Sequence, residues 1–157
     1  MTPLTAEFFK MRIRKAFIKD AEKIANIEIS SGYKWRMKKE EELKMARRIL
    51  NSKNSRVYIL ENKKQIGYFV IRFKKRICYI DFFAIIKSEQ SKGFGSTLME
   101  SIINKARKNR CKKINVSVWQ KNFQAIGLYN KFGFYIIGIK REHYPNKDDK
   151  LIMEKKL

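Results

Sequence analysis

The sequence is poor in the residues from which metal centres and disulfide frameworks are built. Among its 157 residues there is one histidine, His143, and there are two cysteines, Cys78 in an apolar run and Cys111 in a basic one. Two cysteines are too few for a disulfide framework, and these residues do not have metal-ligand spacing. We therefore expect no structural metal and no disulfide-stapled fold.

Long apolar runs are also missing. No stretch approaches the roughly 20 apolar residues that a membrane-spanning helix needs. The start of the chain, residues 1–9, has neither the basic beginning nor the apolar stretch of a secretory signal. We expect a single domain over residues 1–157, with residues 1–9 as a short N-terminal extension. We expect it in the cytoplasm and without a membrane partner.

Acidic residues are few. Lys and Arg together number 37 and Asp and Glu number 15, which gives a net charge of +22. The basic excess is spread along the chain, and this favours a charged surface that keeps the protein soluble over a dedicated nucleic-acid site. Such a surface still attracts acidic partners, so we expect nonspecific association with RNA, DNA or the ribosome.

The periodicity of apolar residues predicts both strands and helices. Strands are predicted at 10–17, 56–61, 65–74, 77–86, 113–119, 134–140 and 150–157, and helices at 21–28, 38–50, 95–109 and 125–132. Asp20 precedes the first helix and is suited to cap it or to lie in its first turn. The polar turns between residues 56 and 86 predict an antiparallel meander. The strand, helix, strand order from 77 to 119 favours a parallel crossover.

One glycine-containing loop, at residues 90–96, lies between a predicted strand and a predicted helix. Its glycines allow a ligand to approach the backbone closely, and the helix that follows offers amides to a phosphate. A P-loop is excluded because no Lys-Ser or Lys-Thr follows the second glycine, Gly95. A dinucleotide fingerprint is excluded because the loop has two glycines only. The pattern indicates a diphosphate-binding loop.

Two sequence motifs resemble those of a known protein family. Gln90, Gly93 and Gly95 match Gln/Arg-x-x-Gly-x-Gly/Ala, and the stretch 122–134 matches Asn-x-x-Ala-Ile-x-Leu-Tyr-x-Lys-x-Gly-Phe. Over about residues 10–157 the chain resembles the GNAT superfamily of N-acetyltransferases. Its segment 141–153 is similar to the ribosomal-protein and other protein N-terminal acetyltransferases. The resemblance implies an α/β (α+β) fold, with a mixed, mostly antiparallel twisted sheet of six to seven strands flanked by about four helices.

The resemblance also implies acetyl-CoA as the acetyl donor, with coenzyme A as a product. The residues that it places around acetyl-CoA are Ile85 and Ile86 at the pantetheine and acetyl carbonyl, Gln90, Ser91, Lys92, Gly93, Phe94, Gly95 and Ser96 at the diphosphate, and Asn122 and Tyr129. Tyr129 is implied as the general acid, which protonates the departing thiolate. The alternative for Tyr129 is a core aromatic that faces inward from its helix.

The general base is where the chain departs from the family. The ribosomal-protein subgroup has a glutamate on the fifth strand, where this chain has Ser117, and a hydroxyl has no useful basicity near neutral pH. We favour Asp81, the only charge in the apolar strand 77–86, together with Tyr79 on the same face of that strand. The alternative for Asp81 is an ion pair with Arg72 of the neighbouring strand.

Three residues are candidates for the acceptor groove. His143 and Tyr144 fall where the N-terminal acetyltransferases carry two groove tyrosines, and the loop 31–35, with Tyr33, is implied as the opposite wall. His143 either brings a titrating group to the substrate or is a solvated hydrogen-bonding group. A fourth residue, Glu28 at the end of the first helix, is either a carboxylate in the same groove or plain surface.

The sequence leaves three functions open. The first is acetyl transfer to a protein amine, foremost an N-terminal α-amine of an acidic peptide. The second is acetylation of a small amine, although a net charge of +22 repels polycations. The third is a basic nucleic-acid-binding or ribosome-associated module of the same fold without turnover. A monomer and a homodimer are both compatible with the sequence.

Overall fold

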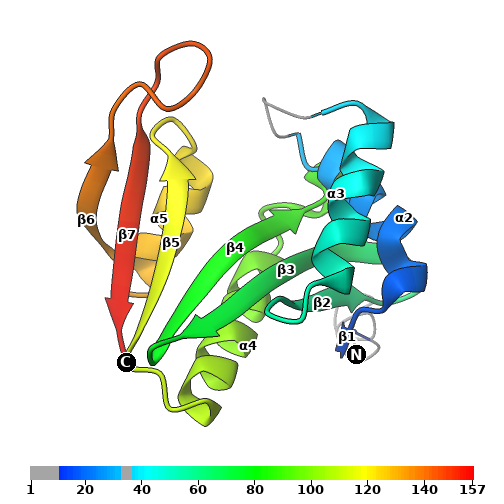
Figure 1. Ribbon diagram of the computed structural model, residues 1–157, viewed down its shortest axis with the longest axis horizontal. Helices are drawn as coiled ribbons and strands as arrows, with labels where there is room; N and C mark the ends of the chain where they lie inside the picture. Colours follow the sequence, from blue (N-terminus) through cyan, green and yellow to red (C-terminus); the bar gives the residue numbers. More distant parts are fainter. Residues whose placement is uncertain (1–10, 33–36) are drawn as a thin grey trace. The chain divides into compact units, whose positions relative to one another are not determined.

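The computed structural model describes residues 11–32 and 37–157 (Figure 1). Its strands are β1 Arg12–Lys15, β2 Arg56–Glu61, β3 Gln65–Lys74, β4 Ile77–Ile85, β5 Lys113–Trp119, β6 Tyr135–Lys140 and β7 Lys150–Lys156. Its α-helices are α2 Ala21–Ser30, α3 Lys39–Asn51, α4 Phe94–Lys108 and α5 Phe123–Lys131. Two short 3-10 turns, η1 Ile18–Asp20 and η2 Lys87–Glu89, precede α2 and follow β4.

The strands form one seven-stranded sheet in the order β1-β2-β3-β4-β5-β7-β6. β1 pairs antiparallel with β2, and β7 pairs antiparallel with both β5 and β6. β4 pairs parallel with β5, from Ile77 opposite Lys113 to Ile80 opposite Val116. The predicted fold class is therefore confirmed, and so is the parallel crossover that runs through α4.

The contacts within the chain divide it into two compact units. The first runs to Val70 and also includes Phe82–Leu98, and the second comprises Ile71–Asp81 and Met99–Leu157. β3, β4 and α4 each contribute residues to both units. The single domain expected from the sequence stays a prediction.

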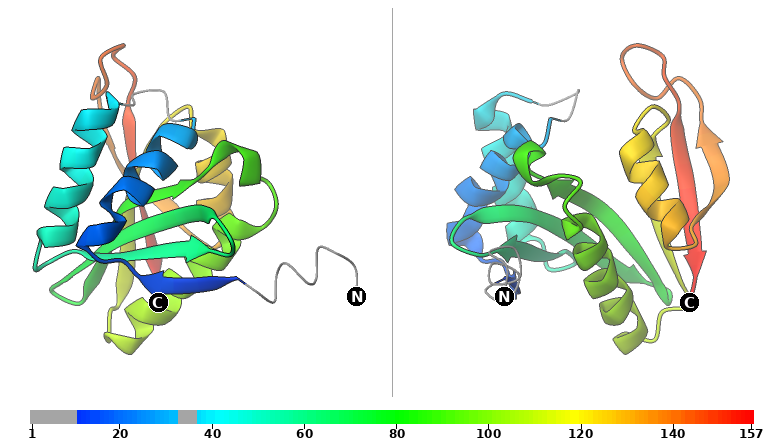
Figure 2. Two further views of the ribbon diagram at one scale, coloured as in Figure 1. Left: turned by 90° about the vertical axis from the view of Figure 1, so that its right-hand side faces the viewer. Right: turned by 180° about the vertical axis from the view of Figure 1, so that it is seen from behind.

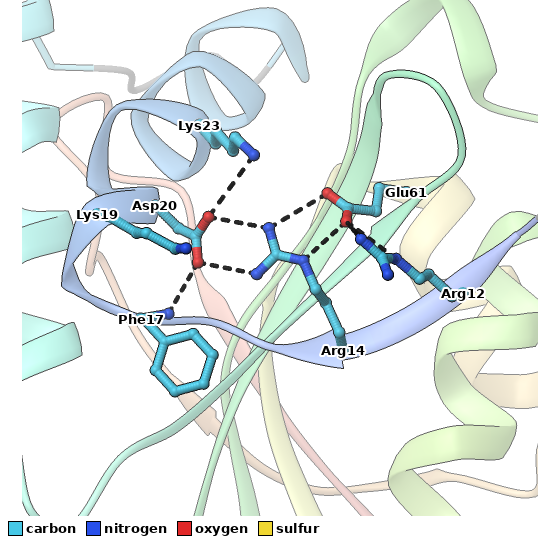
Figure 3. Close-up of a pocket in the computed structure, with 7 residues that line it drawn as sticks. All are labelled: Arg12, Arg14, Phe17, Lys19, Asp20, Lys23 and Glu61. Carbon is cyan, nitrogen blue, oxygen red and sulfur yellow. Dashed lines mark hydrogen bonds and ion pairs between the residues drawn. The ribbon is translucent and has the colours of Figure 1, made fainter.

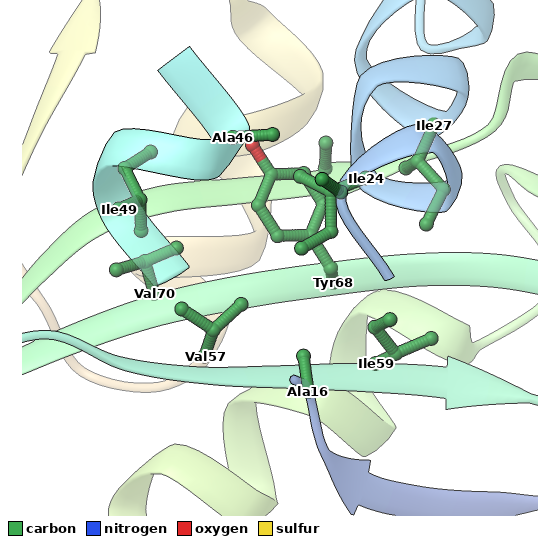
Figure 4. Close-up of a cluster of buried hydrophobic side chains, with 11 residues drawn as sticks. Ala16, Ile24, Ile27, Ala46, Ile49, Val57, Ile59, Tyr68 and Val70 are labelled. Carbon is green, nitrogen blue, oxygen red and sulfur yellow. The ribbon is translucent and has the colours of Figure 1, made fainter. Parts of the chain in front are cut away.

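The core of the first unit lies between the sheet and the helices α2 and α3 (Figure 4). Helical spacing puts Ile24 and Ile27 on one face of α2, and Ala46 and Ile49 on one face of α3. These faces pack on the inward side chains of β2 and β3, which are Val57, Ile59, Tyr68 and Val70. The Tyr68 ring stands between the two helices in Figure 4, and the residue is 1% exposed.

A network of ion pairs joins β1, the start of α2 and the end of β2 (Figure 3). Arg14 donates through Nη1 and Nη2 to the Asp20 carboxylate, at 2.9 Å each, and through Nε to Glu61 at 2.7 Å. The hydrogen bonds from Arg14 lower the pKa of Asp20 to about 2 and also lower the pKa of Glu61. The network therefore keeps Asp20, which is 1% exposed, in its charged form.

Asp20 stands at the N-cap position of α2, as the sequence suggests, but its side chain makes no capping hydrogen bond to that helix. Its carboxylate accepts from Arg14 and from the Phe17 N–H at 2.8 Å instead. The expectation of a side-chain cap is corrected in this respect, because an arginine on β1 binds both carboxylate oxygens.

The second unit contains β5, β7 and β6 with α5 beside them (Figure 2). β5 pairs with β7 over its full length, from Lys113 opposite Lys156 to Trp119 opposite Lys150. The β6–β7 register shifts between Ile136 and Gly138, which marks a bulge. The connection between β6 and β7 is the loop 141–149, which carries two of the predicted groove residues.

The predicted element boundaries are close to those observed. The first helix continues to Ser30, two residues beyond the prediction, and the first strand spans only Arg12–Lys15 because the chain turns into η1 at Ile18. In the described ranges 11–32 and 37–157, no helix combines the length and apolar character needed to cross a membrane.

Candidate active site

The predicted diphosphate loop connects η2 to α4 in the first unit. Ser91 has φ 61° and Gly93 has φ 90°, so two residues in three adopt the left-handed region. Glycine adopts it without strain, which explains Gly93. The loop then enters α4 at Phe94, and α4 is 15 residues long. A helix N-terminus after a loop of this kind favours a phosphate, because the helix dipole is positive there.

The side chain of Gln90 fixes this loop. Its Nε2 donates to the carbonyl of Ser31, at the end of α2, and to the carbonyl of Ile85, at the end of β4, both at 2.9 Å. One amide thus ties the loop to two other elements of the first unit. The sequence assigned Gln90 a backbone contact with acetyl-CoA and did not anticipate this positioning role of its side chain.

Lys92 lies in an ion pair rather than projecting alone. Its Nζ is 3.2 Å from Glu89, whose carboxylate also accepts Lys64 at 2.6 Å. The hydrogen bond from Lys64 is the main cause that lowers the pKa of Glu89, and Lys92 adds to it. Glu89 therefore stays charged and anchors the base of the loop.

The end of β4 is held closely against β3. The N–H of Ile86 donates to the carbonyl of Ile66 at 2.9 Å. A Cβ on Gly67 would lie 2.6 Å from both the Ala84 carbonyl oxygen and the Ile85 Cδ1, so only glycine fits there. The Ile85 carbonyl accepts from Gln90, and the Ile86 carbonyl accepts from the Glu89 N–H at 2.9 Å. The contacts of Ile85 and Ile86 with pantetheine and the acetyl carbonyl stay a prediction.

A pair of carboxylates lies beside this region in the first unit. The Tyr68 hydroxyl donates to Glu28 Oε1 at 2.5 Å. Glu42 of α3 is 7% exposed, and its Oε1 accepts from the Met37 N–H at 3.2 Å. Burial raises the pKa of Glu28, and the nearby charge of Glu42 raises it further, while the bond from Tyr68 acts in the opposite direction. Glu28 is thus a half-buried acid and not plain surface.

Tyr129 and Asn122 belong to α5 in the second unit. Asn122 is the N-cap, and its Oδ1 accepts from the Ala125 N–H at 3.2 Å. Tyr129 lies in the last turn of the helix, two residues before its end, is 4% exposed and packs on Phe134 with ring centroids 5.5 Å apart. Burial raises the pKa of the Tyr129 phenol, so the hydroxyl keeps its proton at neutral pH. Such a group is suited to donate a proton.

Asp81 forms an ion pair with Arg72, in which Nη2 of Arg72 donates to Oδ1 at 2.9 Å and Nε donates to Oδ2. The same guanidinium lies 5.2 Å from the centre of the Tyr79 ring. The alternative weighed for Asp81 is thus present in the second unit, while a catalytic role for Asp81 and Tyr79 stays a prediction. The β4–β5 pairing ends with Ile80 opposite Val116. Asp81 is the next residue after Ile80 on β4, and Ser117 is the next residue after Val116 on β5.

The loop 141–149 is fixed at several points. Trp119 Nε1 donates to Asp148 at 2.9 Å, and the Tyr144 N–H donates to the Asp148 carbonyl at 3.2 Å. The Tyr144 ring lies edge-on to Trp119 at 6.4 Å and to His143 at 5.0 Å. His143 is exposed, and partial desolvation together with two lysines lowers its pKa. Tyr33, the third predicted groove residue, lies outside the described residues.

Comparison with known proteins decides the family. A model of the acetyltransferase (GNAT) family matches residues 21–134. The chain belongs to the GNAT family. Members of this family use acetyl-CoA as the acetyl donor and release coenzyme A. The matched range contains the predicted diphosphate loop, Asn122 and Tyr129.

One curated relative of this acetyltransferase is the spermine/spermidine N(1)-acetyltransferase of Bacillus subtilis. The two are 36% identical over 61 residues, which cover 38% of this chain and 40% of the relative. The match thus spans about two fifths of the relative's length.

Solved structures with the same fold include a ribosomal-protein acetyltransferase. The ribosomal-protein-S18-alanine N-acetyltransferase from Escherichia coli has a TM-score of 0.80 at 20% identity and covers 93% of each chain. Ard1 from Thermoplasma volcanium has a TM-score of 0.78 at 22% identity, with 94% of this chain and 98% of that chain covered. At these identities the likeness establishes the GNAT fold of this acetyltransferase.

The first unit brings together Gln90, the end of β4 and the Glu28–Tyr68 pair. The second unit brings together Arg72, Asp81 and Tyr79 in one cluster. Among residues 11–32 and 37–157, no three His, Cys, Asp or Glu side chains gather as a metal site. Sequence reasoning missed Tyr68, since a tyrosine in a strand of buried residues looks like an ordinary core residue.

Proposed function

We propose that this acetyltransferase acetylates protein amines, foremost the N-terminal α-amine of an acidic peptide. The observation that carries the proposal is the loop 141–149, which presents His143 and Tyr144 on an ordered base formed by Trp119 and Asp148. An aromatic rim that is already ordered binds an extended peptide with little loss of conformational entropy. The resemblance of segment 141–153 to the N-terminal acetyltransferases supports the same conclusion.

The net charge supports an acidic substrate. A surface potential set by +22 charges accelerates association with acidic peptides and slows it for cationic ones. We further propose that the enzyme works in the cytoplasm as a monomer or homodimer, with nonspecific association to RNA or the ribosome as a consequence of the same charge.

The proposed chemistry uses Tyr129 as the general acid. The donor supplies an acetyl thioester, and the amine attacks its carbonyl carbon while the thiolate leaves. The Tyr129 hydroxyl, which burial keeps protonated, gives its proton to that thiolate. Asp81, with Tyr79 beside it, is the sequence's candidate for the proton acceptor, and its ion pair with Arg72 has to open before it can serve.

A small polyamine is the second candidate for the acceptor. Two observations favour it, namely the similarity to a spermine/spermidine N(1)-acetyltransferase and the two carboxylates of Glu28 and Glu42 in the first unit. A local acidic pocket attracts a polycation even on a basic protein, because short-range charges are less screened by salt than the distant surface.

The test measures coenzyme A release with N-terminal peptides, lysine peptides and polyamines, with wild type, Tyr129→Phe, Asp81→Asn and the control Tyr135→Phe. We expect turnover on acidic N-terminal peptides, a loss of about 100-fold in kcat for Tyr129→Phe and none for Tyr135→Phe. Turnover on polyamines alone would replace the peptide proposal with the second candidate. Cofactor binding without turnover on any amine would overturn both.

A further inference from the structure

Glu28 carries an electrostatic cost that no Lys or Arg in the described part of the chain is shown to offset. Within residues 11–32 and 37–157, the charged group that acts on its pKa is Glu42, another acid, and not a Lys or Arg. The 37 basic residues of the chain make this unusual. A buried carboxylate is normally paired with a cation because desolvation disfavours the charge. The arrangement therefore suits a cation that arrives with a ligand.

The geometry gives Glu28 a fixed orientation. Tyr68 stands between α2 and α3 and is 1% exposed, so its hydroxyl has little freedom (Figure 4). That hydroxyl donates to Oε1 of Glu28 at 2.5 Å. A carboxylate held through one oxygen presents the other in a defined direction, as a proton acceptor requires. Glu28 itself is only half-buried, so a ligand can reach it.

Hydrogen bonds connect Glu28 to the acetyl-CoA loop within the first unit. Both the N–H and the Oγ of Ser31 donate to the Glu28 carbonyl, at 3.2 and 2.7 Å. The Ser31 carbonyl in turn accepts from Gln90, which also holds the Ile85 carbonyl. The turn of α2 that carries Glu28 is therefore fastened to the two segments assigned to the donor.

We propose that Glu28 accepts the proton of the incoming ammonium, with Tyr68 as the positioning residue that holds its carboxylate. This inference rests on the proposed function, amine acetylation, and applies to a peptide or a small amine alike. In contrast to Asp81, Glu28 forms no ion pair with another residue of 11–32 and 37–157 that would have to open before it can act.

The proton transfer balances with the acetyl transfer. An ammonium N–H bond breaks and an O–H bond forms on Glu28, which leaves a neutral amine with a free electron pair. That pair forms the new C–N bond to the acetyl carbon as the C–S bond breaks. The thiolate takes a proton from the general acid, and the second proton of the amine returns to that acid once the C–N bond has formed. Glu28 then releases its proton to solvent, so no oxidant or further reactant is needed.

The test is Glu28→Gln, which keeps shape and removes the charge, against Glu22→Gln, an exposed acid on the same helix. We expect Glu28→Gln to lower kcat/KM for the amine by about 100-fold to 10,000-fold. Its acetyl-CoA affinity, measured by calorimetry, should stay within about twofold of wild type, and Glu22→Gln should match wild type in both. Equal acetyl-CoA affinity shows that the variant is folded.

The pH profile separates a proton acceptor from a structural residue. In wild type, kcat/KM should fall on the acid side as Glu28 is protonated, with Glu42 of α3 and Tyr68 of β3 as the titratable groups that face it. Tyr68→Phe removes the bond that favours the carboxylate, so this acid limb should move to higher pH. In Glu28→Gln the acid limb should disappear.

The outcomes distinguish this inference from the proposed function. If wild type acetylates an amine and Glu28→Gln equals it in rate and pH profile, Glu28 is not the acceptor while the function stands. If Asp81→Asn alone abolishes the acid limb, the proton goes to Asp81 and the inference is overturned. If wild type acetylates no amine, the proposed function fails and this inference fails with it.

Discussion

The two ends of α2 carry a buried acid, Asp20, and a half-buried acid, Glu28, with opposite properties. Asp20 at the start is bound by Arg14 through two hydrogen bonds, and its pKa falls to about 2. Glu28, near the end, has a tyrosine hydroxyl and another acid beside it, and burial raises its pKa. The helix dipole adds to the contrast, since it stabilises an acid at the N-terminus and destabilises one near the C-terminus.

The difference shows what decides whether a buried acid serves structure or chemistry. Asp20 serves structure, because Arg14 balances its charge and binds both of its carboxylate oxygens. Glu28 is preorganised by Tyr68 but its charge is unmatched among the described residues. A carboxylate without a cationic partner attracts a cationic substrate more strongly than one that is already paired.

The largest effect on stability is expected for Asp20→Asn. This substitution removes the ion pair between Arg14 and Asp20. Arg14, whose side chain is 22% exposed, then keeps its ion pair with Glu61. The free energy of unfolding should fall by about 3 kcal/mol, because one partner of a buried pair is lost. Urea denaturation followed by circular dichroism measures it, with Glu22→Gln as the control. A loss below about 0.5 kcal/mol would show that Arg14 is satisfied by Glu61 alone.

The pH dependence of stability should carry the signature of Asp20. Its ordinary pKa of 3.8 applies to the unfolded chain and about 2 to the folded one, so its contribution is full above pH 4 and is lost as the pH falls toward 2. The contribution is about 2 kcal/mol. Urea titrations at pH 6, 4, 3 and 2 test it. In Asp20→Asn this part of the acid dependence should be absent, and an unchanged curve would assign it to other carboxylates.

Glu28→Gln should have almost no effect on stability at neutral pH. Two effects oppose one another, since the variant relieves the cost of a buried charge but weakens the bond from Tyr68. The free energy of unfolding should change by no more than about 1 kcal/mol. Because the folded state raises this pKa, any gain should grow as the pH rises through it. A loss of several kcal/mol would make Glu28 structural, like Asp20.

The smallest effect is expected for Glu42→Gln. Removing this like charge lowers the pKa of Glu28, so the acid limb of kcat/KM should move to lower pH, opposite to the shift in Tyr68→Phe. The maximal rate should stay close to that of wild type. A pH-rate profile of the variant measures the shift, and a fall in rate at every pH would instead indicate that Glu42 itself binds the amine.

Most of the fold follows from local sequence pattern. The polar turns around residues 62–64 and 74–76 delimit β2, β3 and β4, and the predicted bounds of these strands differ from those observed by at most one residue. α4 differs by one residue at each end, because its apolar residues recur at helical spacing. Local periodicity sets these elements before any long-range contact forms.

The candidate site is less accessible to such reasoning. The diphosphate loop and the family of the enzyme follow from short motifs, and the Arg72–Asp81 pair follows from neighbouring strands. The Tyr68–Glu28 bond joins residues 40 positions apart, and the Gln90–Ser31 bond joins residues 59 apart. Nothing in the local pattern of either partner signals such a bond, since it depends on how α2 packs against the sheet.

The amide of Gln90 touches the end of α2 and the end of β4 at once. A ligand that orders the loop therefore also steadies Ser31, and through it the turn that carries Glu28. Linkage between two ligands is reciprocal, so donor and amine should raise each other's affinity by the same factor. Without this side chain, as in Gln90→Ala, the two would bind independently. The enzyme would then lose its cooperativity while keeping both of its binding sites.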